Sequence, residues 1–312
     1  TAIALAQNPD SNVWTERPLN QISAHFWYQS SPLGRSEIQD ISQDSIGYIW
    51  MASNEGLLRF DGDKAKVYDL GNTPVFKSES FNQVEQGPAG VLWISSKNHL
   101  YYYQNREFKL WTDATKKLRS GIEKLEFDNK GVLWVLANNW LYTIDSNSSI
   151  LDRLSFGTVK SITKGADGSL WVVNTKSQVF QIWDYQKKVR TDIESLFENN
   201  ILRVIENKSG VVYVALEGGE LFKVHNGKKT KVRWNYSSAP IEIDGLMTDS
   251  NGFVWIEAEG NLNRVNDTQV ETLYHYNGLA DYRVRKVFED RSGDIWVGTY
   301  SGISFLNQTA IG

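Results

Sequence analysis

Cysteine is absent from the 312 residues of this chain, and several other features are scarce. Without cysteine the chain can form no disulfide, no thiolate zinc site and no cysteine nucleophile. Basic and acidic side chains nearly balance, at 33 against 37, so the net charge of −4 offers no basic footprint for nucleic acid. No apolar stretch approaches the roughly 20 residues that a membrane-spanning helix needs. The composition therefore predicts a soluble globular chain, and export stays compatible with it because a large core needs no disulfides.

Aromatic residues and glycine are abundant, with 12 Trp, 14 Tyr, 13 Phe and 24 Gly. Part of this abundance is an internal repeat. One tryptophan recurs about every 42 residues, each time three residues after a glycine, and Tyr213 after Gly210 fills the same place once. The tryptophans are Trp50, Trp93, Trp134, Trp171, Trp255 and Trp296. Seven copies of one structural unit therefore account for nearly the whole chain.

Each copy has the same internal order of apolar segments and turns. The first full copy has an alternating segment from residue 38, the turn Asp44-Ser45-Ile46-Gly47, an aromatic segment at 48–52, a segment at 56–60 and a more variable one at 66–68. This order predicts four short strands per copy. The Asp side chain is expected to cap backbone N–H groups of the turn, and the Gly to take the left-handed conformation.

Seven four-stranded units predict an all-β fold, a seven-bladed β-propeller with antiparallel blades. A single unit cannot bury both of its faces, whereas units stacked around an axis bury them against their neighbours, with the repeating Trp between adjacent blades. The last copy ends after residue 306 with little chain left for a fourth strand, and the segment 23–28 looks like one. We therefore expect the N-terminal strand to close the last blade. The predicted domains are an N-terminal extension at 1–21, a remnant of a signal peptide or of cloning, and one propeller at 22–312.

Two copies carry a resemblance to a known family. The stretches 44–62 and 290–303, the second reading Asp-Arg-Ser-Gly-Asp-Ile-Trp-Val-Gly-Thr-Tyr-Ser-Gly-Ile, resemble the two-component-regulator propeller repeat. The resemblance implies a non-catalytic periplasmic sensor domain without a cofactor. It also implies a full-length protein that is anchored in the membrane, works as a homodimer and carries a histidine kinase or GGDEF diguanylate cyclase as its output module.

The residues give little sign of catalysis. The four histidines are scattered over different copies, and no Gly-x-Ser-x-Gly elbow occurs. Glu257 and Glu259 are expected in the turn between the second and third strands of their blade, where solvated carboxylates are common. Two alternatives nevertheless stay open: a secreted glycan-active enzyme, similar to sialidase or streptogramin-lyase propellers, and a protein-interaction platform.

A ligand is expected on the face where the loops into the innermost strands meet the loops between second and third strands. This face is rich in arginine, which pairs with anionic groups, and it also offers rings on which sugars stack. A small molecule or an oligosaccharide would suit it, and no metal site or catalytic residue is predicted. The candidate ligand-binding residues are Arg35, Glu37, Lys97, His99, Arg119, Trp140, Lys176, Arg203, Arg283, Arg285 and Tyr300.

Overall fold

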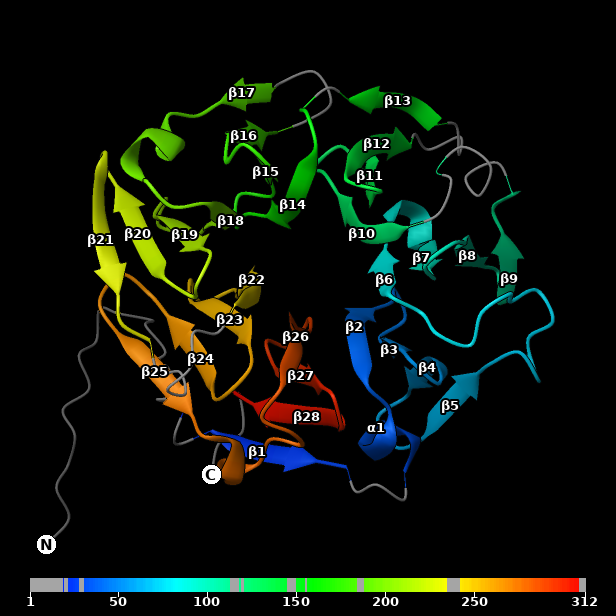
Figure 1. The fold of residues 1–312 in the computed structure, drawn as a ribbon. Helices are drawn as coiled ribbons and strands as arrows, with labels where there is room; N and C mark the ends of the chain where they lie inside the picture. The colour runs from blue at the N-terminus through cyan, green and yellow to red at the C-terminus, as the bar shows by residue number, and fades with distance from the viewer. Residues whose placement is uncertain are drawn as a thin grey trace, which may run out of the picture.

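The structure is a computed structural model. It describes residues 19, 22–27, 31–112, 118, 121–144, 150–154, 156–183, 188–234 and 242–308. Within these ranges the strands form seven four-stranded antiparallel sheets, arranged as blades around a central axis (Figure 1). The predicted seven-bladed β-propeller is confirmed.

The strands follow the chain order, and the first strand of each blade lies innermost. Blades 1 and 2 contain β2 (Ile38–Gln43), β3 (Ile49–Ser53), β4 (Gly56–Phe60), β5 (Ala65–Tyr68), β6 (Gln83–Gln86), β7 (Leu92–Ser95), β8 (Leu100–Gln104) and β9 (Glu107–Leu110). Blades 3 and 4 contain β10 (Ile122–Phe127), β11 (Leu133–Ala137), β12 (Trp140–Ile144), β13 (Ile150–Leu154), β14 (Val159–Lys164), β15 (Leu170–Asn174), β16 (Val179–Ile182) and β17 (Lys188–Arg190). Blades 5 and 6 contain β18 (Ile201–Glu206), β19 (Val212–Leu216), β20 (Leu221–His225), β21 (Lys228–Val232), β22 (Ile243–Thr248), β23 (Val254–Ala258), β24 (Leu262–Val265) and β25 (Val270–Leu273).

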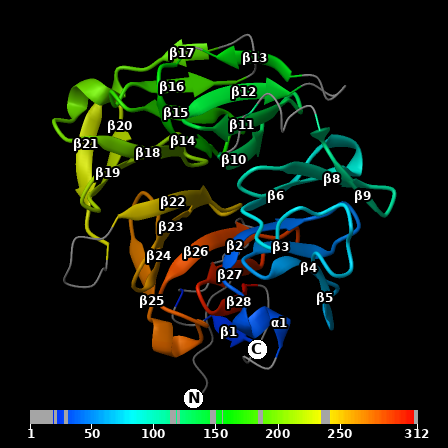
Figure 2. The same ribbon diagram turned by 45° about the vertical axis from the view of Figure 1, so that its right-hand side comes forward.

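The last blade joins the two ends of the chain. It contains β26 (Val284–Glu289), β27 (Ile295–Thr299) and β28 (Gly302–Asn307), and β1 (Ser23–Phe26) pairs with β28 as its outermost strand. Figure 2 shows β1 beside β28 from a second direction. Closure by the N-terminal strand is thus confirmed, and it removes the open edge that an unclosed sheet would expose. The predicted extension at 1–21 lies outside the described residues apart from Leu19.

Short helical turns connect some of the strands: α1 (Pro32–Arg35), η2 (Pro88–Gly90), η3 (Ile193–Leu196) and η4 (His275–Asn277). In the part of the chain that the structure describes, no helix is both long and apolar enough to cross a membrane.

The Asp-x-x-Gly turns are held by the aspartate carboxylate. One oxygen of Asp44 accepts backbone N–H bonds from Ile46, Gly47 and Tyr48 at 2.9–3.0 Å. The other oxygen accepts the indole N–H of Trp50 at 2.7 Å. Gly47 has φ +116°, the left-handed conformation that favours glycine. The same indole bond joins Asp128 to Trp134 at 2.9 Å and recurs in the turns that begin at residues 249 and 290. Capping by Asp is therefore confirmed, and it extends to the core aromatic.

The repeating aromatic residues pack between adjacent blades, as predicted. The buried apolar residues described here fall into seven clusters, and each cluster holds one repeating aromatic residue together with residues of the following blade. Trp50, for example, is fully buried and packs with Phe81 and Val84 of blade 2. Trp296 packs with Ile38 and closes the ring between blades 7 and 1. The core is thus a ring of seven interfaces around an axis that it leaves open.

Three blades lack the capping aspartate. In blade 5, Asn207 stands at this position and caps the turn with its amide oxygen. Gly165 stands where blade 1 has Asp44, since the N–H of Gly165 bonds to the carbonyl of Ser169 as that of Asp44 bonds to Tyr48. The indole N–H of Trp171 is consequently buried without a hydrogen-bond partner. In blade 2, Gly87 leaves room for the ring of Phe127, which would lie 2.6 Å from a Cβ at that position.

We expect Asp128→Ala to lower the free energy of unfolding by about 2–4 kcal/mol, because it leaves the Trp134 indole and two backbone N–H groups buried without acceptors. Urea denaturation followed by tryptophan fluorescence measures this change. Asp61→Ala is the matched control, since the Asp61 carboxylate also caps a turn but is exposed to solvent. Equal effects of the two substitutions would contradict a structural role of the buried carboxylate.

The two kinds of turn also predict different responses to loss of the indole nitrogen. Trp134→Phe removes a buried hydrogen bond and leaves an Asp128 oxygen without its donor, whereas Trp171→Phe removes a donor that has no partner. The packing loss is similar in both. Trp134→Phe should therefore destabilise the protein more than Trp171→Phe, by about 1–3 kcal/mol in the same denaturation measurement. An equal or reversed order would show that the indole bond contributes nothing.

Candidate functional site

The innermost strands of the seven blades surround a central cavity of 680 Å³. In each sheet the innermost strand pairs with another strand on one side only, and its other edge borders the channel. Charged side chains line much of the channel. The cations are Lys124, Lys160, Lys164, Arg203, Lys208, Arg285 and Lys286, and the carboxylates are Glu85, Glu123, Glu126, Asp244, Asp249, Glu257 and Glu289. Positive and negative groups are thus equal in number, so what matters is which of them are paired.

One set of equivalent positions organises the cavity. Each position lies four residues before the residue that begins the turn of its blade, and six of the seven directly follow a register shift in the pairing of the first and second strands. Such a bulge re-aims the residues beside it. We call these seven positions the channel ring: Asp40, Gln83, Lys124, Ser161, Arg203, Gly245 and Lys286. All of them except Asp40 line the cavity.

On one side of the channel ring two carboxylates share one lysine. Lys286 Nζ lies 3.2 Å from Asp40 Oδ1 and 4.0 Å from Glu257 Oε1. Burial opposes the charge of Lys286, but the two carboxylates outweigh it and raise its pKa. Asp40 also accepts the N–H of Val84 at 3.0 Å, and Glu257 that of Val287 at 3.0 Å. These two carboxylates therefore join neighbouring blades as well as holding Lys286.

The prediction that Glu257 lies in a turn is wrong. Glu257 lies within β23 and is 7% exposed, and its carboxylate reaches over Gly245 in β22. A Cβ at residue 245 would lie 1.8 Å from Glu257 Oε2, so this approach requires glycine. Glu259 does follow the strand, where it forms an isolated backbone bridge with Arg283. Because the strand extends past Glu257, the carboxylate points into the channel instead of standing in a solvated turn.

Another part of the cavity holds two acids close together. Lys124 Nζ lies 3.3 Å from Glu126 Oε1. Burial, followed by the charges of Glu126 and Asp40, raises the pKa of Glu85 to about 8. Glu85 therefore keeps its proton at neutral pH, and Glu126 and Lys124 form a separate pair.

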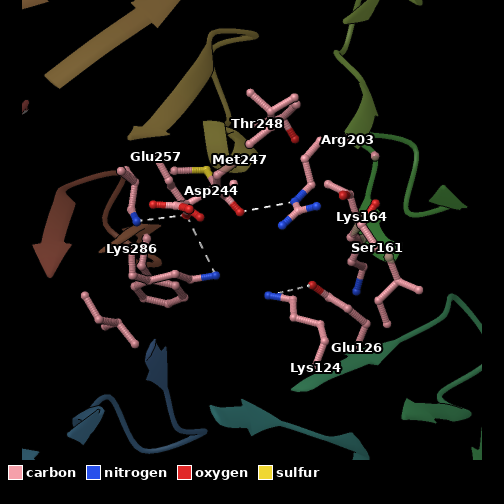
Figure 3. A pocket seen from close by; sticks show the side chains of 18 of the residues that line it. Lys124, Glu126, Ser161, Lys164, Arg203, Asp244, Met247, Thr248, Glu257 and Lys286 are labelled. Atoms are coloured by element: carbon pink, nitrogen blue, oxygen red, sulfur yellow. Dashed lines mark hydrogen bonds and ion pairs between the residues drawn. The ribbon is translucent and has the colours of Figure 1, made fainter. Parts of the chain in front are cut away.

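Arg203 and Lys164 differ from the other cations deep in the cavity. Arg203 donates from Nε to the carbonyl of Asp244 at 3.1 Å and from Nη1 to the carbonyl of Leu202 at 3.1 Å. Burial lowers its pKa, against the opposing charges of Asp244 and Glu257. Figure 3 shows both side chains beside Ser161, whose hydroxyl donates to Leu202 at 2.7 Å. Among the described residues no carboxylate lies within ion-pair distance of Arg203 or Lys164.

Several of the residues predicted from the sequence come together at the junction of blades 7 and 1. Arg285 bonds Glu37 at 2.8 Å, and its guanidinium lies 4.1 Å from the ring centroid of Tyr300. Arg283 lies on the same ring at 4.3 Å. Nearby, Arg35 before the first strand pairs with Glu55 of a second-to-third strand turn at 3.3 Å. These contacts place the two kinds of loop on one face, as the sequence analysis assumed.

The remaining predicted residues are dispersed over other blades. Lys97 and Lys176 are exposed in turns, and Trp140 begins β12 and is half-buried. His99 Nδ1 lies 3.4 Å from the Ser96 hydroxyl, and burial together with Lys77 lowers its pKa. Arg119 lies outside the described residues. Of the predicted set, only Arg203 and Arg285 line the cavity.

Sequence reasoning missed the cavity residues Glu85, Lys124, Lys164 and Lys286. Lys124 and Lys286 share one signal, a lysine four residues before the turn of their blade, whereas Glu85 lies two residues and Lys164 one residue before theirs. Within the described ranges, no three His, Asp or Glu side chains gather as a metal site would require. None of the four histidines lines the cavity.

Comparisons with known proteins support the propeller fold. Residues 278–301 match the family model described as the two component regulator propeller, which confirms the resemblance for the last repeat. No curated protein matches the sequence significantly. One similar structure is the extracellular domain of BT3049 from B. thetaiotaomicron, which is assigned as a hybrid two component system. It has a TM-score of 0.72 at 18% identity over 92% of this chain.

This chain covers only 42% of the BT3049 structure, so it spans less than half of that relative. Virginiamycin B lyase from Staphylococcus aureus is also similar, with a TM-score of 0.69 at 12% identity, covering 92% of this chain and 99% of the lyase. A third similar structure is PorZ, a surface component of the type-IX secretion system of Porphyromonas gingivalis. Its TM-score is 0.65 at 14% identity, over 88% of this chain and 46% of PorZ. At these identities the comparisons establish the fold alone, which is shared by the extracellular domain of a two component system, a lyase and a secretion component.

Proposed function

We propose that this chain is the extracytoplasmic, ligand-sensing domain of a membrane-bound bacterial signalling protein. Its ligand is a small molecule or an oligosaccharide, its location is periplasmic, and its output module is a histidine kinase or a diguanylate cyclase. The observation that carries the proposal is the preformed polar cavity, in which Arg203 and Lys164 face the open channel without a carboxylate partner. The family match of the last repeat and the likeness to BT3049 support the signalling context.

The cavity has the size and rigidity of a small-molecule site. Its 680 Å³ fall within the roughly 300–1,000 Å³ that is typical of ligand pockets. Seven strands belonging to a closed ring form its walls, so the polar groups are held in place before a ligand arrives. Little binding energy is then lost in ordering the site.

The chemistry of the cavity favours binding over turnover. A nucleophile needs a base within hydrogen-bond reach. The hydroxyl of Ser161 donates instead to a backbone carbonyl, and Glu257 is engaged by Lys286 and by the N–H of Val287. We therefore infer a non-enzymatic domain, whose response to ligand reaches the output module through a homodimer of the full-length protein.

A thermal-shift screen tests this function. The chain is heated with sugars, oligosaccharides, amino acids, nucleotides and organic acids, and each mixture is checked for conversion by mass spectrometry. A ligand at about 100 times its Kd should stabilise the fold by about 2.7 kcal/mol and raise the melting temperature. We expect a saturable shift without conversion, and loss of the shift on Arg285→Gln or Arg203→Gln.

Two outcomes would overturn the proposed function. Conversion of a stabilising ligand would make the protein an enzyme, as in the lyase with a similar fold. No shift with any compound, together with capture of a polypeptide on the loop face, would make it an interaction platform. Lys97→Gln, which removes an exposed charge outside the cavity, is the control that should keep the full shift.

A further inference from the structure

The charge pairing in the cavity is asymmetric. Most of its cations have a carboxylate partner: Lys286 pairs with Asp40, Lys124 with Glu126, Lys160 with Glu217 and Arg285 with Glu37. Lys208 is exposed and donates to the carbonyl of Ser250. Arg203 and Lys164 remain, on the adjacent strands β18 and β14. The cavity cations that have no carboxylate within ion-pair distance are therefore confined to blades 4 and 5.

Buried or half-buried cations without counter-charge are costly, because they have lost water without gaining an ion pair. Both bonds that Arg203 makes go to neutral carbonyl oxygens and leave its Nη2 donors unused, and the carboxylates whose charges act on it, led by Asp244, lie beyond ion-pair distance. Among the described residues the Lys164 ammonium, with its three donors, has no hydrogen-bond or ion-pair partner. Ser161 lies next to both. Its hydroxyl oxygen can accept a hydrogen bond, whereas its proton is already donated to the carbonyl of Leu202.

We propose that the channel binds a small oxyanion, a carboxylate or phosphate group of its ligand, between Arg203 and Lys164. This inference rests on the proposed function and names the chemical class that its cavity recognises. Arg203 supplies a planar fork of donors that suits two oxygens of one anionic group, and Lys164 supplies a point charge. The cluster of Lys286, Asp40 and Glu257 holds one cation and two carboxylates, so it suits a neutral or cationic part of the ligand and not a second anionic group.

Glu85 gives this site a dependence on pH. Charged groups from four other innermost strands act on it: Asp40 of β2, Lys124 and Glu126 of β10, Lys164 of β14 and Lys286 of β26. Below its raised pKa of about 8, Glu85 is neutral and adds no negative charge to the cavity that it lines with Lys164. As the pH rises through that value, Glu85 ionises and its charge repels an oxyanion bound in the same cavity. Affinity for the anion should therefore fall in this range.

Isothermal titration calorimetry with inorganic phosphate, succinate and citrate tests the site, with succinamide as the uncharged match for succinate. We expect at least one anion to bind and succinamide to fail. Lys164→Gln should weaken anion binding about tenfold or more, the loss expected for a charge-assisted hydrogen bond. Lys228→Gln removes the same charge from an exposed position in β21, the outermost strand of blade 5, and should leave binding unchanged.

The pH dependence of the affinity is a readout that would not change if Glu85 had only a structural role. Between pH 7 and 9 the affinity of the wild-type chain should fall, and in Glu85→Gln it should fall less. Arg203→Gln also breaks a bond between blades, so Lys164→Gln is the deciding variant if the Arg203 variant unfolds. Thermal shifts with neutral ligands but none with anions would overturn this inference while leaving the proposed function intact. Anion binding that Lys164→Gln leaves unchanged would also overturn it.

Discussion

In four of the seven blades a turn aspartate bonds the indole of the repeating tryptophan, and this contact links each of those turns to the core between blades. A single carboxylate fixes the backbone of the turn with one oxygen and the orientation of the core ring with the other. The ring then fills the interface with the next blade, as Trp50 does against blade 2. A local turn is in this way coupled to the packing that sets the angle between blades. Because the ring must close on β1 and β28, small errors in that angle would accumulate around seven interfaces.

Closure of the ring explains why the charged residues gather at the axis. The apolar surface of each blade is used in its two interfaces, and the unpaired edge of the innermost strand borders the channel. The residues along the channel do not follow the repeat and differ from blade to blade. At the same channel-ring position, blade 3 has Lys124, blade 4 Ser161 and blade 5 Arg203. The repeat therefore builds the walls of the cavity, and the residues that vary within the repeat determine its chemistry.

The propeller, its seven blades and the capped turns could be predicted because each rests on a pattern that repeats along the chain. The closing strand could be predicted because the last copy lacks a fourth strand of its own. The cavity could not be predicted in the same way. A bulge near the start of most innermost strands shifts the alternation of inward and outward residues, so Lys124 and Lys286 could not be assigned to the channel from periodicity alone. Glu257 was misplaced because nothing local shows that its strand continues over Gly245.

The charges in the channel also have a consequence for stability. For a buried ion pair such as Lys286 with Asp40, the attraction between the charges returns less free energy than the loss of their hydration costs. Arg203 and Lys164 have no carboxylate within ion-pair distance among the described residues. The fold tolerates them because seven apolar interfaces hold the ring together independently of its axis. A cavity that is polar and incompletely neutralised contributes little to folding, so its composition is better explained by what it binds. An anion that binds only the folded channel stabilises the folded state by mass action, which couples occupancy of the channel to the stability of the whole propeller.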